Sequence, residues 1–420
     1  MHDVMYHYGF NEVSGNFQFD NLGRGGVGND AVMAEAQDGG GTNNANFLTL
    51  PDGVPGRMQM YLWTSNESAE LVHIQQSPGY PSGNVSFVAV PAAFGPEITT
   101  TGVSAELVLV EANANSASSC DPCGCGTGQG VGLPPGNNVQ GKIVLIDRGD
   151  CSFVEKVQGA QLGGAVGVIV ANNVPGTAPI AMGGSVEGGS SSILIPSVMI
   201  SYEDGQILKD ELVQGATVVS LKRLTPAPPM KDGDFDNGVI AHEYGHGIST
   251  RLTGGPSSTC LSGDEQAGEG WSDYFALMLT MDPATIATIG AEGRGVGSYV
   301  FSQPSNGLGI RPAKYSTDFA VNDYTYADIA NPEISVPHGV GFIFATALWE
   351  MTIKLIEQYG YTTDLYSADL TKGNTLALQL VIDGLKLQPC SPTFLESRDA
   401  ILAADMALTG GANQCLIWEA

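Results

Sequence analysis

The C-terminal half of the chain has apolar residues at every third or fourth position, which is the period of a helix with one buried face. This pattern predicts helices at 238–251, 268–281, 338–358, 375–388 and 392–408. The last helix also has end signals: Ser391 is a candidate N-cap, Pro392 stands at the first helical position, and Gly410 follows the end. The first residues have helical spacing too, so the chain begins in or near a short helix.

The middle of the chain has a different pattern, in which short apolar runs alternate with helical stretches. It predicts strands at 141–147, 164–172, 195–201 and 216–224, and helices at 151–162 and 202–213. This alternation is typical of a small α/β unit. Two segments rich in Pro, Gly and Ser, 77–84 and 224–234, flank it. We therefore expect an α/β domain at 83–224, inserted into a mostly helical α+β domain made of 1–82 and 225–420.

The charge balance argues against two classes of partner. The chain has 17 basic and 44 acidic residues, for a formal net charge of −27. Binding to nucleic acid or to an anionic membrane needs basic patches, and none is visible. Hydrophobic residues make up 43% of the chain, as in a globular protein with a sizeable core. We expect no apolar run long enough to span a bilayer.

A metal-binding motif, His-Glu-x-x-His, stands on the helix expected at 238–251. Residues four positions apart share a face of a helix, so His242 and His246 can bind one zinc ion. Glu243 is then placed to act as general base on a water molecule at the metal. The alternative is that the motif occurs by chance on a helix of the hydrophobic core.

A catalytic zinc ion needs a third protein ligand and one open position. No His occurs between His246 and His338, so a third His soon after the motif is excluded. Glu269 opens the next apolar helix and is the predicted third ligand, with Asp273 on the same face to orient a ligand His. The alternatives are that these are two carboxylates favoured by the helix dipole, or that Glu265 is the ligand instead.

His338 begins a strongly apolar helix, where its side chain can face a cleft. Its functional interpretation is a hydrogen-bond donor to the oxyanion, and its alternative is a capping or surface residue. The acidic run 232–238 resembles the start of a calcium-binding loop, but position six of the loop is Asn237 rather than Gly. We interpret it as a turn before the helix, and bound calcium remains an open alternative.

With these motifs in place, the sequence resembles the fungalysin family of secreted zinc metalloproteases. The resemblance is carried by segments such as MHDVMYHYGF, PDGVPGRMQMYLW, DGDFDNGVIAHEYGHGIS, GEGWSDYFALML and LVIDGLKLQPCSPTFLESRDAIL. It covers 1–76 and about 230–420. The middle part resembles a protease-associated (PA) domain through GKIVLIDRGDCSFVEKVQGAQLGGAVGVIVAN and IPSVMISYEDG.

The resemblance implies a thermolysin-like fold for the catalytic domain and an endopeptidase that favours an apolar residue after the cut. It implies zinc binding by the two motif histidines and Glu269, with His338 as the oxyanion donor. Asn44 and Ala45 would hydrogen-bond to the substrate backbone, and Arg311 would hold a substrate carbonyl. It also implies secretion, protein or peptide substrates and an inhibitory propeptide that is removed. No Tyr lies between 247 and 268, where thermolysin has a second oxyanion donor, so His338 would act with another group.

The seven cysteines fit an exported protein with a few disulfides. We expect Cys390 to pair with Cys415, Cys260 to be free, and Cys151 to pair with one of Cys120, Cys123 and Cys125. The alternatives are a cytosolic chain with reduced thiols or a zinc knuckle at 120–125.

Two other functions remain open alternatives. One is a metallo-aminopeptidase, because PA domains also occur beside such enzymes. The other is a non-catalytic binding protein that uses the insert. For the assembly we expect a monomer.

Overall fold

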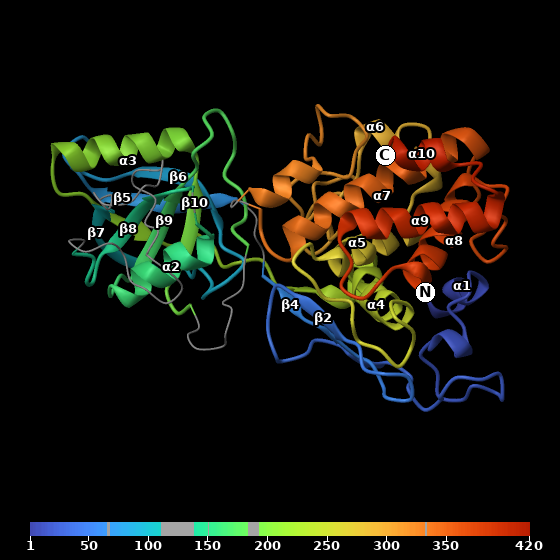
Figure 1. The fold of residues 1–420 in the computed structure, drawn as a ribbon. Coiled ribbons are helices and arrows are strands. Elements are labelled where there is room, and N and C mark those ends of the chain that lie inside the picture. Colours follow the sequence, from blue (N-terminus) through green and yellow to red (C-terminus); the bar gives the residue numbers. More distant parts are fainter. Residues whose placement is uncertain (65–67, 111–137, 150, 184–192, 332–333) are drawn as a thin grey trace. The chain divides into compact units, whose positions relative to one another are not determined.

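The computed structural model describes residues 1–420 except 65–67, 111–137, 150, 184–192 and 332–333 (Figure 1). The chain forms two compact units. Unit 1 is Met1–Trp63 together with Lys231–Ala420, and unit 2 is Thr64–Met230. The sequence predicts that the insert begins at 83. The structure places its start earlier, because strand β5 (Ala69–Gln76) is hydrogen-bonded on both edges to strands of unit 2.

Unit 2 is a closed barrel with the strand order β10-β6-β5-β11-β7-β8-β9. The pairs β7–β8, β8–β9 and β9–β10 are parallel, and the other pairs are antiparallel. Besides β5, its strands are β6 (Val85–Pro91), β7 (Val103–Leu109), β8 (Ile143–Asp147), β9 (Gly167–Ala171), β10 (Ser197–Ile200) and β11 (Val218–Leu221). The strands and helices expected after residue 140 are confirmed, with slightly shorter strands, whereas β5 to β7 were not predicted.

Two helices cover unit 2, α2 (Phe153–Leu162) and α3 (Tyr202–Gln214). Alternate residues of β9 belong to different hydrophobic clusters: Ile169 packs in one with Leu208 of α3, and Val168 packs in another with Val157 of α2. Because side chains alternate between the two faces of a strand, β9 is buried on both faces. That explains why its sequence is an uninterrupted apolar run.

Unit 1 is built around helices, and its largest hydrophobic cluster joins all the long ones. They are α4 (Asn237–Leu252), α5 (Ala267–Leu279), α7 (His338–Tyr359), α8 (Gly373–Leu387) and α9 (Phe394–Thr409). Shorter helices are α1 (His2–His7), α6 (Ile289–Glu292) and α10 (Gln414–Trp418). All five helices that the apolar period predicts are present, and α5 packs between α4 and α7. The expected helix at the start of the chain is α1.

The start of α9 differs from the prediction. Ser391 does not cap it and has a left-handed backbone with φ 50°. The N-cap is Thr393, which accepts a hydrogen bond from the Glu396 amide, while Glu396 bonds back to Thr393. This reciprocal pair satisfies two amides that would otherwise lack partners, so it is a stronger start signal than the Ser-Pro pair. The expected Gly410 does end the helix, in a left-handed conformation.

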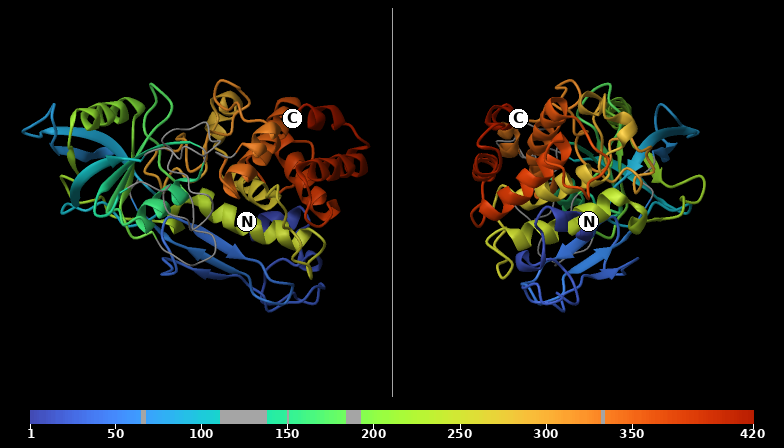
Figure 2. Two further views of the ribbon diagram at one scale, coloured as in Figure 1. Left: turned by 60° about the vertical axis from the view of Figure 1, so that its left-hand side comes forward. Right: turned by 90° about the vertical axis from the view of Figure 1, so that its right-hand side faces the viewer.

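A small sheet lies beside α4, with the strand order β1-β3-β2. Its strands are β1 (Met33–Glu35), β2 (Ala45–Leu48) and β3 (Arg57–Met60). Both views of Figure 2 show these strands, in blue, running along the yellow-green helix α4. Since β2 pairs with β3 alone, its other edge is free of strands in the described part of the chain.

Arg251 ties this N-terminal segment to α4. Its side chain is fully buried, and it donates to the carbonyl oxygens of Leu50 at 2.7 Å and Gly15 at 2.9 Å. It also forms an ion pair of 3.0 Å with buried Asp30. A buried cation needs this many acceptors to offset its lost hydration. The contacts fix the segment before β1 and the loop after β2 to the helix that carries the metal-binding motif.

The cysteine predictions for unit 1 were wrong. Cys260 pairs with Cys390, and Cys415 is free and exposed. Cys260 follows α4 and Cys390 precedes α9, so the loops between helices bring them together, rather than the two ends of one helical hairpin. Cys151 is disulfide-bonded, but Cys120, Cys123 and Cys125 lie outside the described residues, so that prediction stays untested.

Helix α7 departs from the expectation that no apolar run is long enough to cross a bilayer. It has 22 residues and a window of mean hydropathy 1.4. Of that window, 83% is buried inside the structure. Its residues belong to the central hydrophobic cluster of unit 1, so its apolar character has an explanation in packing.

Candidate metal centre

Small residues allow the three helices of the site to approach closely. A Cβ atom added at Gly245 of α4 would lie 2.9 Å from the Ser272 backbone of α5. A Cβ atom added at Gly341 of α7 would lie 2.2 Å from the Cβ of Glu269. Neither glycine can therefore carry a side chain without moving a helix. These two contacts bring α5, with Glu269 at its first turn, against both α4 and α7.

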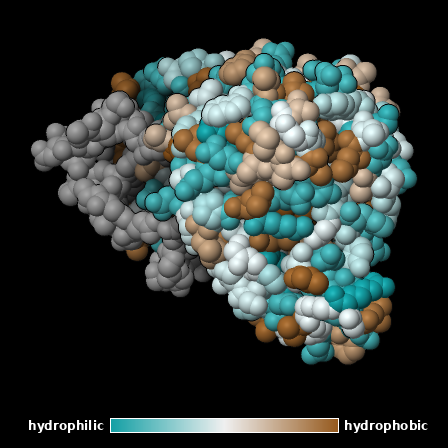
Figure 3. Space-filling view, turned by 45° about the vertical axis from the view of Figure 1, so that its right-hand side comes forward, coloured by the Kyte–Doolittle hydropathy of each residue, from teal (hydrophilic) through white to brown (hydrophobic). Residues whose placement is uncertain are grey.

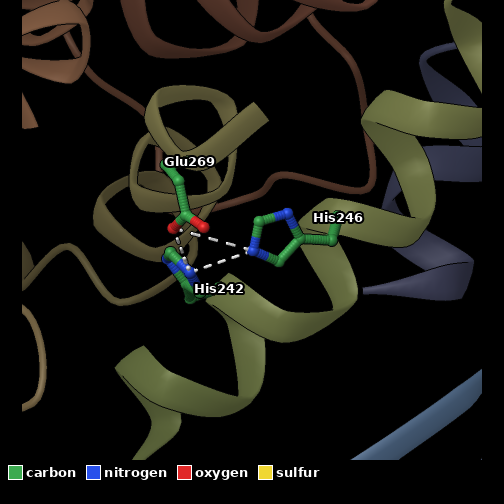
Figure 4. A group of neighbouring side chains, drawn as sticks. All are labelled: His242, His246 and Glu269. Atoms are coloured by element: carbon green, nitrogen blue, oxygen red, sulfur yellow. Dashed lines mark hydrogen bonds and ion pairs between the residues drawn. The ribbon is translucent and has the colours of Figure 1, made fainter. Parts of the chain in front are cut away.

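The ligand atoms of His242, His246 and Glu269 converge (Figure 4). The two Nε2 atoms are 3.2 Å apart, and Glu269 Oε2 lies 3.3 Å from Nε2 of His242 and 3.8 Å from Nε2 of His246. Ligands held about 2.0–2.1 Å from a tetrahedral zinc ion are about 3.3 Å from one another. The arrangement therefore fits one metal ion of that size. It is the one such group of His, Cys, Asp and Glu found in the described part of the chain.

The carboxylate of Glu269 has the character of a metal ligand. Its Oε2 atom is buried and forms no hydrogen bond within the described residues. Burial acts to raise the pKa of Glu269, but the nearby His338 and His246 hold it below its usual range, so the group is an anion. A buried anion without a hydrogen-bond donor is costly, and a cation at this position would remove that cost.

Glu243 follows His242 on α4 and is 5% exposed. Burial raises the pKa of its carboxyl to about 7. A general base works best when its pKa lies near the operating pH, so the environment suits Glu243 to take up and release a proton. Burial also lowers the pKa of His246 to about 4, which keeps this imidazole neutral. Burial acts in the same direction on His242, but the Asp273 carboxylate outweighs it and raises the pKa of His242 to about 10, so a metal ion would have to displace a proton from this ring.

Asp273 is the hub of a buried network behind the ligands. Its Oδ1 atom accepts from Nδ1 of His242 at 2.7 Å, which leaves Nε2 of that ring for a metal. Arg311 donates to both carboxylate oxygens, at 2.6 and 2.8 Å, and the hydroxyl of Tyr315 donates to Oδ2. Burial would raise the pKa of Asp273, but the charges of Arg311 and His242 hold it well below its usual range.

The other predicted residues lie as follows. His338 is the first residue of α7, is 44% exposed, and has its Nε2 atom 3.7 Å from Glu269 Oε2. Asn44 is exposed and directly precedes β2, which Ala45 begins. Thr49, just after β2, donates to the carbonyl oxygen of His246 at 3.3 Å, so this strand is anchored to the helix of the ligands.

Sequence reasoning missed Tyr315, and it assigned Arg311 to the substrate without finding its partner. Both stand outside the regular helices and are far along the chain from Asp273. No local spacing brings these residues together, so neither contact left a signal in the sequence.

The calcium hypothesis gains no support from the described residues of the acidic run. The Asp232 carboxylate accepts from the Asp234 amide and from the Gln37 side chain. Asp236 caps α4 by accepting from the amides of Gly238 and Val239. These carboxylates hold the turn that starts α4, as the turn interpretation expects.

The whole chain, residues 1–420, matches the model of a family described as Fungalysin metallopeptidase (M36). Extracellular metalloproteinase MEP of Neosartorya fischeri is 29% identical over 426 residues, which is 100% of this chain and 40% of that protein. Extracellular metalloproteinase MEP of Fusarium vanettenii is 30% identical over 425 residues, or 99% of this chain and 40% of that protein. This chain thus spans about 40% of the length of these relatives.

Among solved structures, a zinc aminopeptidase from Bacillus subtilis matches 45% of this chain and 33% of its own chain, at 21% identity. Its TM-score of 0.25 is too low for the likeness to bear on the fold.

Proposed function

Because this chain belongs to the fungalysin metallopeptidase family, we propose that it is a secreted, zinc-dependent endopeptidase that hydrolyses internal peptide bonds of proteins. The observation that carries the proposal is the convergence of His242, His246 and Glu269, with the buried Glu243 beside them. A two-His, one-Glu set leaves one position of a tetrahedral zinc ion open, which is what catalysis needs. The names of the relatives support secretion.

The chemistry divides between the metal and the protein. A zinc ion at this site would supply a Lewis acid that polarises the scissile carbonyl and lowers the pKa of water to about 7. Glu243 takes a proton from the attacking water and passes it to the leaving amine. His338, at the exposed start of α7, donates a hydrogen bond to the carbonyl oxygen as negative charge develops there. Asp273 keeps His242 in the tautomer that binds metal.

The substrate backbone is proposed to lie along the free edge of β2, near Asn44 and Ala45. An edge strand offers unpaired amide and carbonyl groups that an extended peptide can use. Arg311 is held by Asp273 and is proposed to reach a substrate carbonyl with its remaining donors. The residue after the cut is proposed to be apolar.

The finer architecture is also a proposal. We assign a thermolysin-like fold to unit 1 and a PA domain to unit 2. Unit 2 is proposed to bind protein substrates or to restrict access to the site. The protein is proposed to be a monomer that is held inactive by its own propeptide before processing.

A Glu243→Gln variant tests this function. It removes the base and keeps the size of the side chain, so kcat should fall about 10²- to 10⁴-fold while the zinc content stays at one ion per chain. The substrate is an internally quenched peptide blocked at both ends, because an aminopeptidase cannot cut it. The control is Glu292→Gln, an exposed carboxylate outside the site. Full activity of Glu243→Gln, or a wild-type chain that cuts only unblocked peptides, would refute the proposal.

A further inference from the structure

A cavity of about 170 Å³ opens beside the metal ligands of unit 1. His246 and Glu269 form one side of it, and the loop before α5 forms most of the rest, including Leu261, Ser262 and Gln266. Pro392, just before α9, completes the lining. A dry cavity of similar size holds a benzene molecule, so this one has room for a side chain the size of leucine or glutamine.

Several contacts hold in place the outer wall of this cavity, which consists of the loop before α5 and the segment that precedes α9. The Cys260–Cys390 disulfide joins its two halves, and the Ser391 amide donates to the carbonyl oxygen of Cys260 at 2.8 Å. Glu265 accepts from the Phe394 amide at 2.5 Å and from the Tyr326 hydroxyl at 2.9 Å. The wall is therefore fixed to α9 before any ligand arrives, and a preformed pocket loses little entropy on binding.

The position of the cavity relative to Glu243 decides which part of a substrate it can take. In the proposed function, on which this inference rests, Glu243 delivers a proton to the leaving amine. The residues after the cut must then lie on the side of Glu243. Neither Glu243 nor Arg311 lines the cavity. A cavity that borders His246 and Glu269 but not the base is better placed for the acyl side, where the residue before the cut is held.

The lining favours an uncharged side chain. Leu261, Ala267 and Pro392 offer apolar surface, while Ser262 and Gln266 offer hydrogen bonds. The Gln266 side chain precedes α5 but does not cap it. We propose that this cavity binds the side chain of the substrate residue before the scissile bond, and that Gln266 selects an uncharged side chain of medium size there. Among such side chains, glutamine combines an apolar stem with an end that can pair with the amide of Gln266.

The backbone at Gln266 makes it a convenient test position. Its φ of 51° lies in the left-handed region, which glycine adopts without strain, so Gln266→Gly should fold. Loss of one hydrogen bond is worth about 1 kcal/mol, or roughly a fivefold change. We expect kcat/KM for a peptide with glutamine before the cut to fall about fivefold relative to one with leucine there.

Gln266→Glu adds a charge without changing the shape. It should raise kcat/KM for lysine before the cut about tenfold relative to glutamine, with no change in the preference after the cut. The matched control is Gln358→Glu, an exposed glutamine near the C-terminal end of α7, which should leave the whole profile unchanged.

The outcomes separate the inference from the function beneath it. If the wild-type chain cuts none of the blocked peptides, the proposed function fails. If it cuts them, but both Gln266 variants keep the wild-type profile before the cut, or change the profile only after the cut, the assignment of this cavity is wrong.

Discussion

Asp273 is fully buried and accepts hydrogen bonds from three side chains, those of His242, Arg311 and Tyr315. Two of these donors come from the loop between α6 and α7, so one carboxylate couples that loop to the helix of the ligands. Its contact with Nδ1 of His242 fixes the ring orientation. In other metal sites, such a partner contributes about 10- to 100-fold to metal affinity.

Asp273→Asn should therefore weaken zinc binding by about 10- to 100-fold, because the amide accepts more weakly and leaves Arg311 without a full ion pair. Affinity is measured by competition with a chelator on protein whose folding has been verified by circular dichroism. Asp399→Asn, an exposed carboxylate on α9, is the control and should bind zinc as the wild type does. An unchanged zinc affinity of Asp273→Asn would show that Asp273 does not orient His242 for metal binding.

The distance between two site residues along the chain determined whether the sequence could predict that they lie together. The two histidines and Glu243 lie within one turn or so of a helix, and Glu269 and Asp273 are likewise one turn apart. Local periodicity was enough to place the two histidines on one face of their helix, and the two carboxylates on one face of theirs. The contact of Asp273 with Tyr315 depends on a loop whose path no local rule gives.

The disulfide between two interhelical loops of unit 1 is the feature that the sequence predicted wrongly. Cys260 and Cys390 are 130 residues apart and form a disulfide, while Cys415 is free. Proximity along the chain favoured Cys390 with Cys415, but the helix packing of unit 1 decides which cysteines meet.

Cys390→Ser should lower the free energy of unfolding by roughly 2–5 kcal/mol under oxidising conditions, because a cross-link over so long a loop restricts the unfolded chain. Cys415→Ser is the matched control and should change it little, since this thiol is exposed and unpaired. Chemical denaturation with the zinc site loaded gives both values. Equal stability of the two variants would argue against the Cys260–Cys390 pair.

The start of α9 allows a second test on helices. Thr393→Ala should cost about 1 kcal/mol, since the Glu396 amide loses its acceptor and the Glu396 carboxylate loses the Thr393 hydroxyl. Ser391→Ala should cost clearly less, because Ser391 lies before the cap. Thermal unfolding compares the two. A larger loss of stability for Ser391→Ala than for Thr393→Ala would support Ser391 as the N-cap, as the sequence alone predicted.

Across the whole molecule, unit 2 is inserted into a hairpin of unit 1. Strand β4 (Leu62–Trp63) precedes the insert, β12 (Lys231–Asp232) follows it, and Trp63 pairs directly with Lys231. Unit 2 also has hydrophobic clusters of its own. The change of hydrophobic period predicted an inserted unit. It missed the first three strands of that unit, β5 to β7, because polar residues interrupt their apolar ones.

Replacing 64–230 with Asn-Gly should leave unit 1 folded, because two residues can close an antiparallel hairpin between paired positions. We expect this variant to bind zinc within about threefold of the full chain, since each ligand lies in unit 1. Circular dichroism and chelator competition measure the two properties. A variant that folds but no longer binds zinc would mean that the metal site needs the insert.

The proposed monomeric state is a property of the whole molecule to which surface composition and charge both contribute. On the face drawn in Figure 3, hydrophobic residues are interspersed with hydrophilic ones. The net charge of −27 adds mutual repulsion, which favours the proposed monomer.

We propose that two imidazoles and one carboxylate bind one zinc ion, and anomalous diffraction at the zinc edge from crystals grown with zinc locates that ion. We expect a single strong peak in unit 1, about 2.0–2.2 Å from Nε2 of His242, Nε2 of His246 and a carboxylate oxygen of Glu269. A peak coordinated by other residues, or no peak between these three side chains, would contradict it.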